Sequence, residues 1–223
     1  VLPNTTEESL LYTEGFGVPP EKISVIPNGV EKRFYDAKPF LFSKKFGVRD
    51  FILNVGHVGP ERKNILRLIQ ALEGINKQAV IIGRIEKGED GRKCLELAKK
   101  NPRLKILDSI PHDSELLASA YAACDVFALP SLFETPGIAA LEAALAGAKI
   151  VITPHGGTKD YFALQTEYVD PYSVDSIRKG IQKAAAKRKD SSLRERIRRE
   201  FLWERVGEKT KKAYETALAK EGR

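Results

Sequence analysis

The chain contains 223 residues, of which 42% are hydrophobic and 30% are charged, and its formal net charge is +7. A chain of this length buries roughly 70% of its unfolded surface, which is enough for one sizeable core. The composition is that of an ordinary soluble protein, and no apolar run reaches the roughly 20 residues that a membrane-spanning helix needs.

The cysteines and the start of the chain bear on its compartment. Cys94 and Cys124 lack the spacing of a metal site and no secretory signal precedes Val1, so we expect reduced thiols in a cytoplasmic protein. The sequence contains no methionine, which leads us to expect a fragment of a longer protein or a processed one.

The positive charge is concentrated in the last part of the chain. Residues 178–223 carry 16 basic and 7 acidic side chains. These alternate with Leu193, Ile197 and Phe201 at helical spacing, which favours a solvated helix face. We expect no nucleic acid partner. An anionic membrane surface, with the protein at its periphery, stays open as a partner of this segment.

The first 35 residues differ from the rest of the chain. The stretch "VLPNTTEESLLYTEGFG" predicts a short strand and then a helix with Thr6 as its N-cap. The stretch "ISVIPNGV" predicts a strand that ends in a turn at Asn28 and Gly29. Neither piece has enough partners to form a domain.

From residue 51 onward, short apolar runs alternate with helical patterns. We expect strands at 51–55, 79–82, 104–107, 126–129, 150–153 and 167–169, and helices at 64–74, 90–100, 113–123, 137–146 and 158–163. Strands that are apolar on both faces and separated by helices indicate an α/β fold with a doubly wound, Rossmann-like parallel sheet. After residue 172 we expect a helical tail that ends with a helix at 203–219. Ligands in this architecture bind beyond the carboxyl ends of the strands.

The loop after the first strand of this sheet, "NVGHVGPERKNI", combines glycines with two cations. Gly56 and Gly59 let the backbone turn tightly, and Arg62 and Lys63 stand just before the next helix. A guanidinium beside an ammonium suits a diphosphate, but two exposed surface charges fit the same letters. The loop matches neither Gly-x-Gly-x-x-Gly nor the Walker A pattern, which disfavours an ordinary NAD or P-loop ATP site.

The stretch "SLFETPGIAALEAALAG" places a glycine and two glutamates around a helix start. The amides of Gly137, Ile138 and Ala139 are expected to point out of the helix unpaired, which attracts a phosphate. Glu134 in the loop and Glu142 in the second turn then border the pocket, where sugar hydroxyls would lie. In the alternative interpretation, Glu134 only favours the helix dipole and Glu142 is a solvated helix residue.

The loop "TPHGGTKDYF" follows the fifth strand. Gly156 and Gly157 bring its backbone near the same crevice, and Asp160 is placed to accept from hydroxyls. His155 and His112 have no partner visible in the sequence, and we expect structural roles for both, with His112 at a helix start. Three histidines without clustered acids argue against a metal site, and no Gly-x-Ser-x-Gly elbow supports a Ser-His-Asp triad.

In combination, these motifs resemble the donor-binding half of glycosyltransferase family 4, whose members are retaining enzymes of the GT-B fold. The resemblance covers nearly the whole chain through "VIPNGV", "NVGHVGPERKN", "AYAACDVFALPSLFETPGIAALEAALAG", "HGGTKDYF" and "FLWERVGEKTKKAYE". Glu134 and Glu142 match the Glu-x7-Glu motif of that family, and the surrounding "PS-x-x-E-x-x-G-x-x-x-L-E-A" pattern makes the match fairly specific.

The resemblance implies a role for each candidate residue. Arg62 and Lys63 would hold the diphosphate of a nucleotide sugar, and the amides of residues 137–139 would bind its distal phosphate. Glu142 would accept hydrogen bonds from the ribose hydroxyls, and Glu134 would contact the transferred sugar. The expected catalytic residues are therefore Glu134, Arg62 and Lys63.

Two positions depart from the family pattern. His57 stands where many members have Arg, which weakens one phosphate contact, and Asp160 stands where many have Glu, which shortens the reach of that acceptor. The resemblance implies no cofactor and no metal, because the cations at the leaving group are side chains.

The resemblance also implies a domain organisation. Residues 1–35 would be the end of an acceptor-binding domain and a linker, residues 36–190 the nucleotide-sugar-binding domain, and residues 191–223 helices that pack back toward the N-terminal domain. Since the acceptor-binding domain is mostly absent, we expect the isolated chain to bind nucleotide but to transfer sugar weakly or not at all. A GT-B phosphorylase or epimerase and a non-catalytic nucleotide-sugar-binding module stay open as alternatives.

Overall fold

A sheet of six parallel strands forms the centre of the computed structural model, which describes residues 1–221. The strands are β1 (Phe51–Val55), β2 (Ala79–Ile82), β3 (Leu104–Leu107), β4 (Cys124–Leu129), β5 (Lys149–Ile152) and β6 (Glu167–Tyr168). Their order is β3-β2-β1-β4-β5-β6, so the direction of winding reverses between β1 and β4. The prediction of a doubly wound parallel sheet is confirmed, and each of the six strands predicted from residue 51 onward is present with ends shifted by at most two residues.

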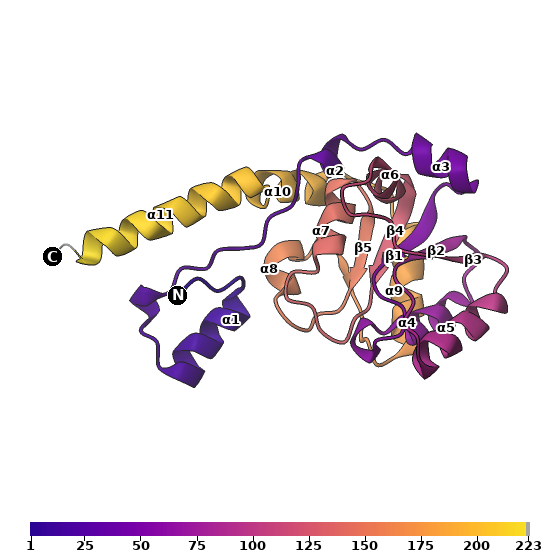
Figure 1. Cartoon of the computed structure of the whole chain (residues 1–223), viewed down its shortest axis with the longest axis horizontal. Coiled ribbons are helices and arrows are strands. Elements are labelled where there is room, and N and C mark those ends of the chain that lie inside the picture. The colour runs from indigo at the N-terminus through magenta and orange to yellow at the C-terminus, as the bar shows by residue number, and fades with distance from the viewer. Residues whose placement is uncertain (222–223) are drawn as a thin grey trace.

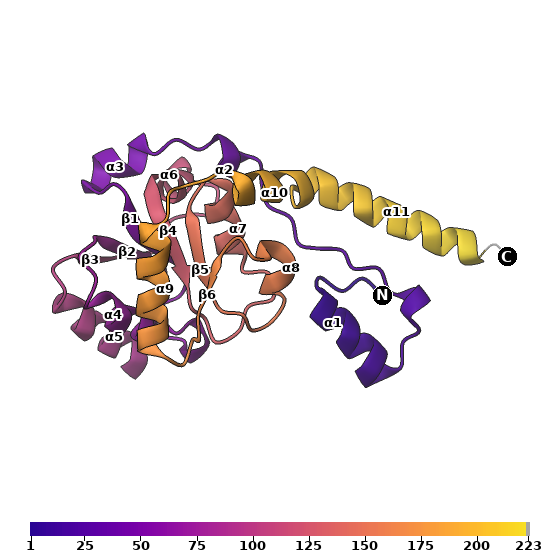
Figure 2. The same ribbon diagram turned by 180° about the vertical axis from the view of Figure 1, so that it is seen from behind.

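Helices cover both faces of the sheet (Figure 1 and, from behind, Figure 2). One face is packed by α4 (Ile65–Leu72), α5 (Glu89–Lys99) and α9 (Val174–Ala186). The other is packed by α2 (Arg33–Asp36), α3 (Phe40–Phe46), α6 (Glu115–Ala123), α7 (Ile138–Leu145), α8 (Thr158–Phe162) and α10 (Ser192–Glu200). The short helices α2 and α3 were not predicted from the sequence, because four and seven residues are too few for a clear helical period.

Alternation along the strands divides the core into two clusters. Ile52 and Val126 belong to the cluster under α4 and α9, whereas the adjacent Leu53 and Phe127 face α6 and α7. All four side chains are buried, as expected for a parallel sheet that is covered on both faces.

The N-terminal segment lies beside this α/β unit and is built differently from the prediction. Its helix α1 (Thr6–Leu10) is capped by Thr5, whose side chain accepts from the Glu8 amide, and not by Thr6. Both predicted strands in this segment are wrong. The two stretches are linked by hydrogen bonds from Ser24 N to Val1 O and from Ile26 N to Pro3 O, and within residues 1–221 no strand lies beside this pair to extend it.

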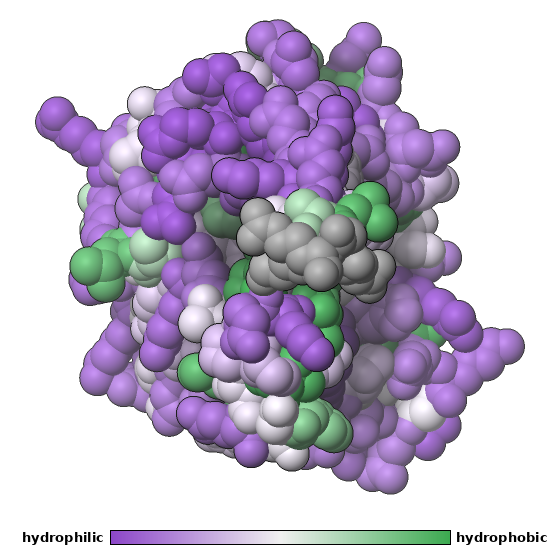
Figure 3. Space-filling view, turned by 90° about the vertical axis from the view of Figure 1, so that its left-hand side faces the viewer, coloured by the Kyte–Doolittle hydropathy of each residue, from purple (hydrophilic) through white to green (hydrophobic). Residues whose placement is uncertain are grey.

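The last helix, α11 (Trp203–Glu221), leaves the α/β unit on the same side as the N-terminal segment (Figures 1 and 2). The Trp203 ring lies against Gly29, and Val30 exchanges backbone hydrogen bonds with Phe201 and Trp203. Figure 3 views the molecule from this side and shows hydrophobic side chains gathered in an otherwise hydrophilic surface. Leu11, Phe16 and, on α11, Trp203, Tyr214 and Leu218 are each more than half exposed.

Candidate functional site

The loop between β1 and α4 is held by hydrogen bonds near the point, between β1 and β4, where the direction of winding reverses. Gly56 N donates to Ile82 O, and a short 3₁₀ turn, Glu61–Lys63, carries the cations. Asn64 then adopts a left-handed backbone with φ 57°, and its buried side chain donates to Pro130 O at 2.8 Å and Pro171 O at 2.6 Å. Asn64 therefore ties this loop to the β4–α7 loop. This role was not predicted, because its one signal in the sequence was an asparagine directly before a helix.

The β4–α7 loop brings Glu134 to the two cations. Lys63 Nζ lies 2.7 Å from Glu134 Oε1, and Arg62 donates to Phe133 O at 3.0 Å while lying 3.6 Å from the same carboxylate oxygen. The loop is held in place because Leu132 N donates to Arg62 O and Glu134 N donates to His155 O. The predicted grouping of Arg62, Lys63 and Glu134 at one edge of the sheet is thus present.

The amino end of α7 faces the same space. Gly137 is the N-cap with φ 72°, a conformation that favours glycine, and no side chain caps the helix there. The amides that follow Gly137 are those that an α-helix leaves without an internal partner. A pocket of about 580 Å³ lies in front of them. Its lining includes Arg62, Lys63, Glu134, Gly137, Ile138 and Ala139 together with Asn4 and Asn28 of the N-terminal segment.

Glu142 lies in the second turn of α7 and is only 3% exposed, so it is not a solvated helix residue. Its Oε1 is 2.7 Å from His112 Nε2, and it does not line the 580 Å³ pocket. Burial raises the pKa of Glu142, while hydrogen bonds from His112 and Tyr121 and the charge of Arg33 act in the opposite direction. The partnership with His112 was missed because the two residues are 30 positions apart and only the fold brings them together.

The glycine-rich loop after β5 supports the Glu134 loop from behind. A side chain added at Gly156, where φ is 84°, would meet Glu134 O at 2.2 Å, and one at Gly157 would meet the side chain of Thr5 at 2.0 Å. Asp160 Oδ2 accepts from the backbone amide of Thr6 at 2.6 Å, and this carboxylate therefore contacts the N-terminal segment.

Tyr161 joins both stretches of the N-terminal segment to α8. Its hydroxyl accepts from Asn28 N at 2.9 Å and donates to Asn4 O at 3.0 Å. Two asparagines that line the pocket are therefore positioned by this tyrosine, which the sequence analysis did not single out.

Gly56 and His57 lie outside the pocket lining, as do the predicted residues Glu142, Gly156, Gly157 and Asp160. Gly56 directly follows β1, and a side chain added there would lie 4.0 Å from Lys63 Cδ. The side chain of His57 is exposed. Across residues 1–221 no group of three or more His, Cys, Asp or Glu side chains is arranged to hold a metal ion. Over the same residues no helix is long and apolar enough to cross a membrane.

The fold and the site define a Rossmann-like domain with a pocket at the reversal point of its sheet, lined by an uncapped helix start and two cations. The sequence comparisons then identify the family. Residues 40–200 match the model of the glycosyl transferases group 1, and the chain belongs to this family.

The sequence relatives are longer than this chain. The chain is 29% identical over 232 residues to an uncharacterized glycosyltransferase of Methanocaldococcus jannaschii, covering 93% of this chain and 57% of the relative. It is 25% identical over 224 residues to an MMP alpha-(1->4)-mannosyltransferase of Mycolicibacterium hassiacum, covering 92% of this chain and 51% of that protein.

Solved structures share the fold. A sucrose-phosphate synthase from Thermosynechococcus elongatus matches 98% of this chain over 58% of its own length, with a TM-score of 0.81 at 22% identity. Anabaena HepE in complex with UDP and glucose matches 98% of this chain over 63% of its own length, with a TM-score of 0.75 at 22% identity. The chain therefore has the Rossmann-like fold found in part of these GT-B glycosyltransferases.

Proposed function

We propose that this chain is the donor-binding part of a retaining glycosyltransferase, which transfers a sugar from a nucleotide sugar to an acceptor hydroxyl. The observation that carries the proposal is the Lys63–Glu134 pair at 2.7 Å, placed with Arg62 in front of the uncapped start of α7. Helix amides and two cations suit a diphosphate, and the neighbouring carboxylate suits sugar hydroxyls. Solved structures of the same fold in complex with UDP and glucose or with UDP-glucose support this class of ligand.

The chemistry assigned to the site is departure of a nucleoside diphosphate. The bond between the anomeric carbon and the diphosphate oxygen breaks, and the diphosphate keeps the electron pair. The acceptor oxygen bonds to the anomeric carbon on the same face, which retains the configuration, and its proton leaves with the diphosphate. Arg62, Lys63 and the amides of residues 137–139 stabilise the negative charge that develops on the leaving oxygen.

The remaining predicted residues have supporting roles in the proposal. Glu134 contacts the transferred sugar while it is held by Lys63, and Glu142 accepts from the ribose hydroxyls. Gly156 and Gly157 keep the Glu134 loop close to the sheet. Because Asp160 accepts a hydrogen bond from the backbone amide of Thr6, its contribution is to join the donor domain to the N-terminal segment.

We place the acceptor site on a domain outside this chain. The domain division that we propose is 1–35 for the end of that domain and the linker, 36–190 for the donor domain, and 191–223 for the helices that return toward it. The N-terminal segment and α11 lie on the same side of the molecule and carry the exposed apolar side chains of Phe16, Trp203, Tyr214 and Leu218. These side chains are the surface on which such a domain would pack. The isolated chain should then bind donor with little transfer, and full transfer activity of these 223 residues would contradict this division.

The decisive experiment is calorimetric titration of the chain with UDP, GDP and ADP and with their sugar conjugates. We expect one nucleotide series to bind, and Lys63→Ala and Glu142→Ala each to weaken that binding at least about tenfold. Lys93→Ala is the matched control, because Lys93 is an exposed lysine on α5 that pairs with Glu89. Unchanged affinity in both site variants contradicts the proposal.

A further inference from the structure

The contact between Glu142 and His112 joins a buried carboxylate to an imidazole from another element. Glu142 belongs to α7 and its side chain is 5% exposed, whereas His112 lies in the loop between β3 and α6 and its side chain is 58% exposed. His112 Nε2 and Glu142 Oε1 are 2.7 Å apart, which is hydrogen-bonding distance. One edge of the imidazole is therefore fixed on the carboxylate while the rest of the ring faces outward.

His112 is itself held by the segment that precedes α2 and by the start of that helix. Arg33 donates to His112 O, and the Phe34 ring lies 5.8 Å from the imidazole, centroid to centroid. Glu31 Oε1 is 3.8 Å from His112 Nδ1, and Glu31 also pairs with Arg33 at 2.6 Å. The imidazole thus stands between two carboxylates, Glu31 on the outside and Glu142 on the inside.

The protonation state of the Glu142 carboxyl group decides whether it accepts or donates hydrogen bonds. Burial raises its pKa, and a protonated carboxyl would lose acceptor capacity. The groups that oppose burial are the hydrogen bonds from His112 and Tyr121 and the positive charge of Arg33. His112 is the exposed member of this set, while Tyr121 is 1% exposed and packs on Phe34 and Phe127.

We propose that His112 is a positioning residue that holds the Glu142 carboxylate in the orientation and charge in which it accepts hydrogen bonds from the ribose of a nucleoside diphosphate. The inference rests on the proposed function for the identity of the ligand. It adds a residue outside the Glu-x7-Glu motif, supplied by the β3–α6 loop and secured by Glu31, Arg33 and Phe34. Discrimination between ribose and a sugar without its hydroxyls is then controlled from that loop.

The experiment compares UDP, GDP and ADP with their 2′,3′-dideoxy counterparts by calorimetry on the full 223-residue chain. His112→Ala is expected to reduce the preference for the ribose form about tenfold while affinity for the dideoxy form changes little. His112→Gln, whose amide donates near the place of Nε2, is expected to restore most of the preference. The neighbouring exposed Asp113, which has no role in the site, provides the control Asp113→Ala.

Two results of this titration overturn the inference. If His112→Ala weakens the affinity for the ribose form and the dideoxy form equally, His112 maintains the conformation of the loop and does not position Glu142. Tighter binding of the ribose form in His112→Ala means that the imidazole occupies the place of the ribose hydroxyls and competes with them.

A second measurement needs no ligand. In a titration followed by the ¹³C signal of the Glu142 carboxyl carbon, His112→Ala is expected to move the midpoint to higher pH, because the hydrogen bond that opposes burial is lost. An unchanged midpoint contradicts the positioning of Glu142 by His112. Failure of the unmodified chain to bind any of the three nucleotides contradicts instead the proposed function and, with it, the ribose role.

Discussion

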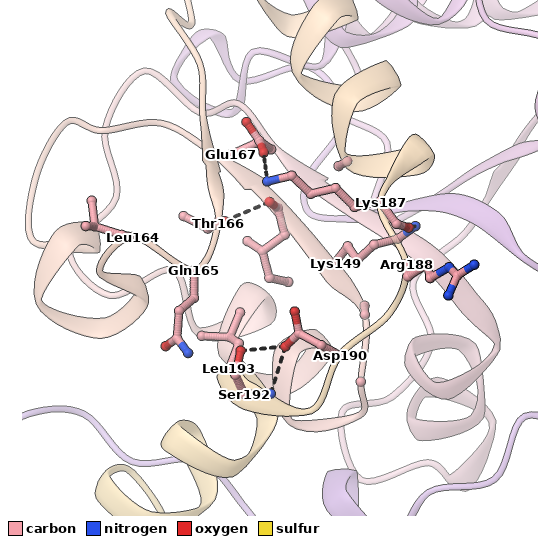
Figure 4. A pocket seen from close by; sticks show the side chains of 14 residues that line it. Lys149, Leu164, Gln165, Thr166, Glu167, Lys187, Arg188, Asp190, Ser192 and Leu193 are labelled. Atoms are coloured by element: carbon pink, nitrogen blue, oxygen red, sulfur yellow. Dashed lines mark hydrogen bonds and ion pairs between the residues drawn. The ribbon is translucent and has the colours of Figure 1, made fainter.

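The two ends of the parallel sheet both carry lysine–carboxylate pairs, but the pairs face different surroundings. At the amino ends of β5 and β6, Lys149 pairs with Asp125 at 3.0 Å and Glu167 pairs with Lys183 and Lys187. Lys149, Glu167 and Lys187 line a pocket of about 270 Å³ (Figure 4). At the carboxyl ends of β1 and β4, the Lys63–Glu134 pair faces the 580 Å³ pocket. The same type of ion pair therefore occurs in two roles.

The direction of the helices explains the difference. Helices that alternate with parallel strands end at the amino edge of the sheet, where their last carbonyls lack internal partners. Lys149 donates to Ala185 O and Lys187 O at the end of α9, and Arg194 donates to Leu145 O at the end of α7. The cations at this edge therefore donate to the carbonyls at helix ends. The helix starts at the opposite edge keep unpaired amides, and an external anion is expected to bind there.

The largest difference in stability between the two edges is expected when one glycine at each edge is replaced by alanine. An alanine at Gly156 (φ 84°) would meet Glu134 O at 2.2 Å, whereas one at Gly147 (φ 97°), in the lining of the amino-edge pocket, would meet only Arg194 Cδ at 3.9 Å. We expect Gly147→Ala to cost about 1–2 kcal/mol from backbone strain alone. Gly156→Ala should cost about 3–5 kcal/mol, because the Glu134 loop must also move.

Urea unfolding of the two variants measures these costs, and calorimetry measures nucleotide binding. Gly156→Ala should weaken binding as well as stability, since it displaces the loop that carries Glu134. Equal destabilisation by the two substitutions would mean that the close approach at Gly156 is relieved without moving that loop.

The next largest effect is expected from removing one lysine from each edge. Lys149→Met leaves Asp125 with Lys77 only and leaves two helix-end carbonyls without their donor, so we expect a loss of about 2–3 kcal/mol and unchanged nucleotide binding. Lys63→Met should change stability by less than about 1 kcal/mol, because Arg62 stays near Glu134 beside an open pocket. Its binding of nucleoside diphosphate should weaken about 10- to 100-fold.

Methionine keeps the aliphatic stem of both lysines, so the comparison isolates the ammonium groups. The same urea and calorimetric measurements apply to both variants. A loss of stability in Lys63→Met that equals the loss in Lys149→Met would assign both pairs to the fold and remove the distinction between the edges.

The sheet and the residues at its carboxyl edge could be predicted because both depend on short-range sequence patterns. Apolar runs located the six strands, and "ERK" and "ETPG" placed Arg62, Lys63, Glu134 and Gly137 in loops at one edge. The Lys63–Glu134 contact itself joins residues 71 positions apart, and its distance became known only from the fold.

The contacts that were missed involve residues without a local pattern. His112 and Glu142 meet because the β3–α6 loop lies over α7, and Asn64 reaches carbonyls of two other loops. The N-terminal strands were wrong for a related reason. The letters "ISVI" favour a strand, but a strand needs neighbours on the sheet, and this segment has only its own first residues.

The smallest effect is a difference in the sign of the pH dependence of stability at the two edges. Burial raises the pKa of Glu167, but the hydrogen bonds and charges of Lys187 and Lys183 outweigh it and leave the pKa below the ordinary 4.5. The native state then holds this proton less tightly than the unfolded state. The stability that Glu167 adds relative to Glu167→Gln is present above pH 4.5 and is lost as the pH falls through the lowered pKa.

Glu142 is expected to do the opposite. Burial raises its pKa above 4.5 despite the hydrogen bonds of His112 and Tyr121, so the native state takes up the proton before the unfolded state as the pH falls. The stability of the unmodified chain relative to Glu142→Gln should therefore rise as the pH falls from the raised pKa to 4.5. Urea unfolding of the chain and both glutamine variants, from above the raised pKa of Glu142 to below the lowered pKa of Glu167, measures the two slopes. Slopes of the same sign would mean that the partners of Glu142 favour its ionised form as strongly as the lysines favour that of Glu167. The pKa of Glu142 would then not be raised in the native state.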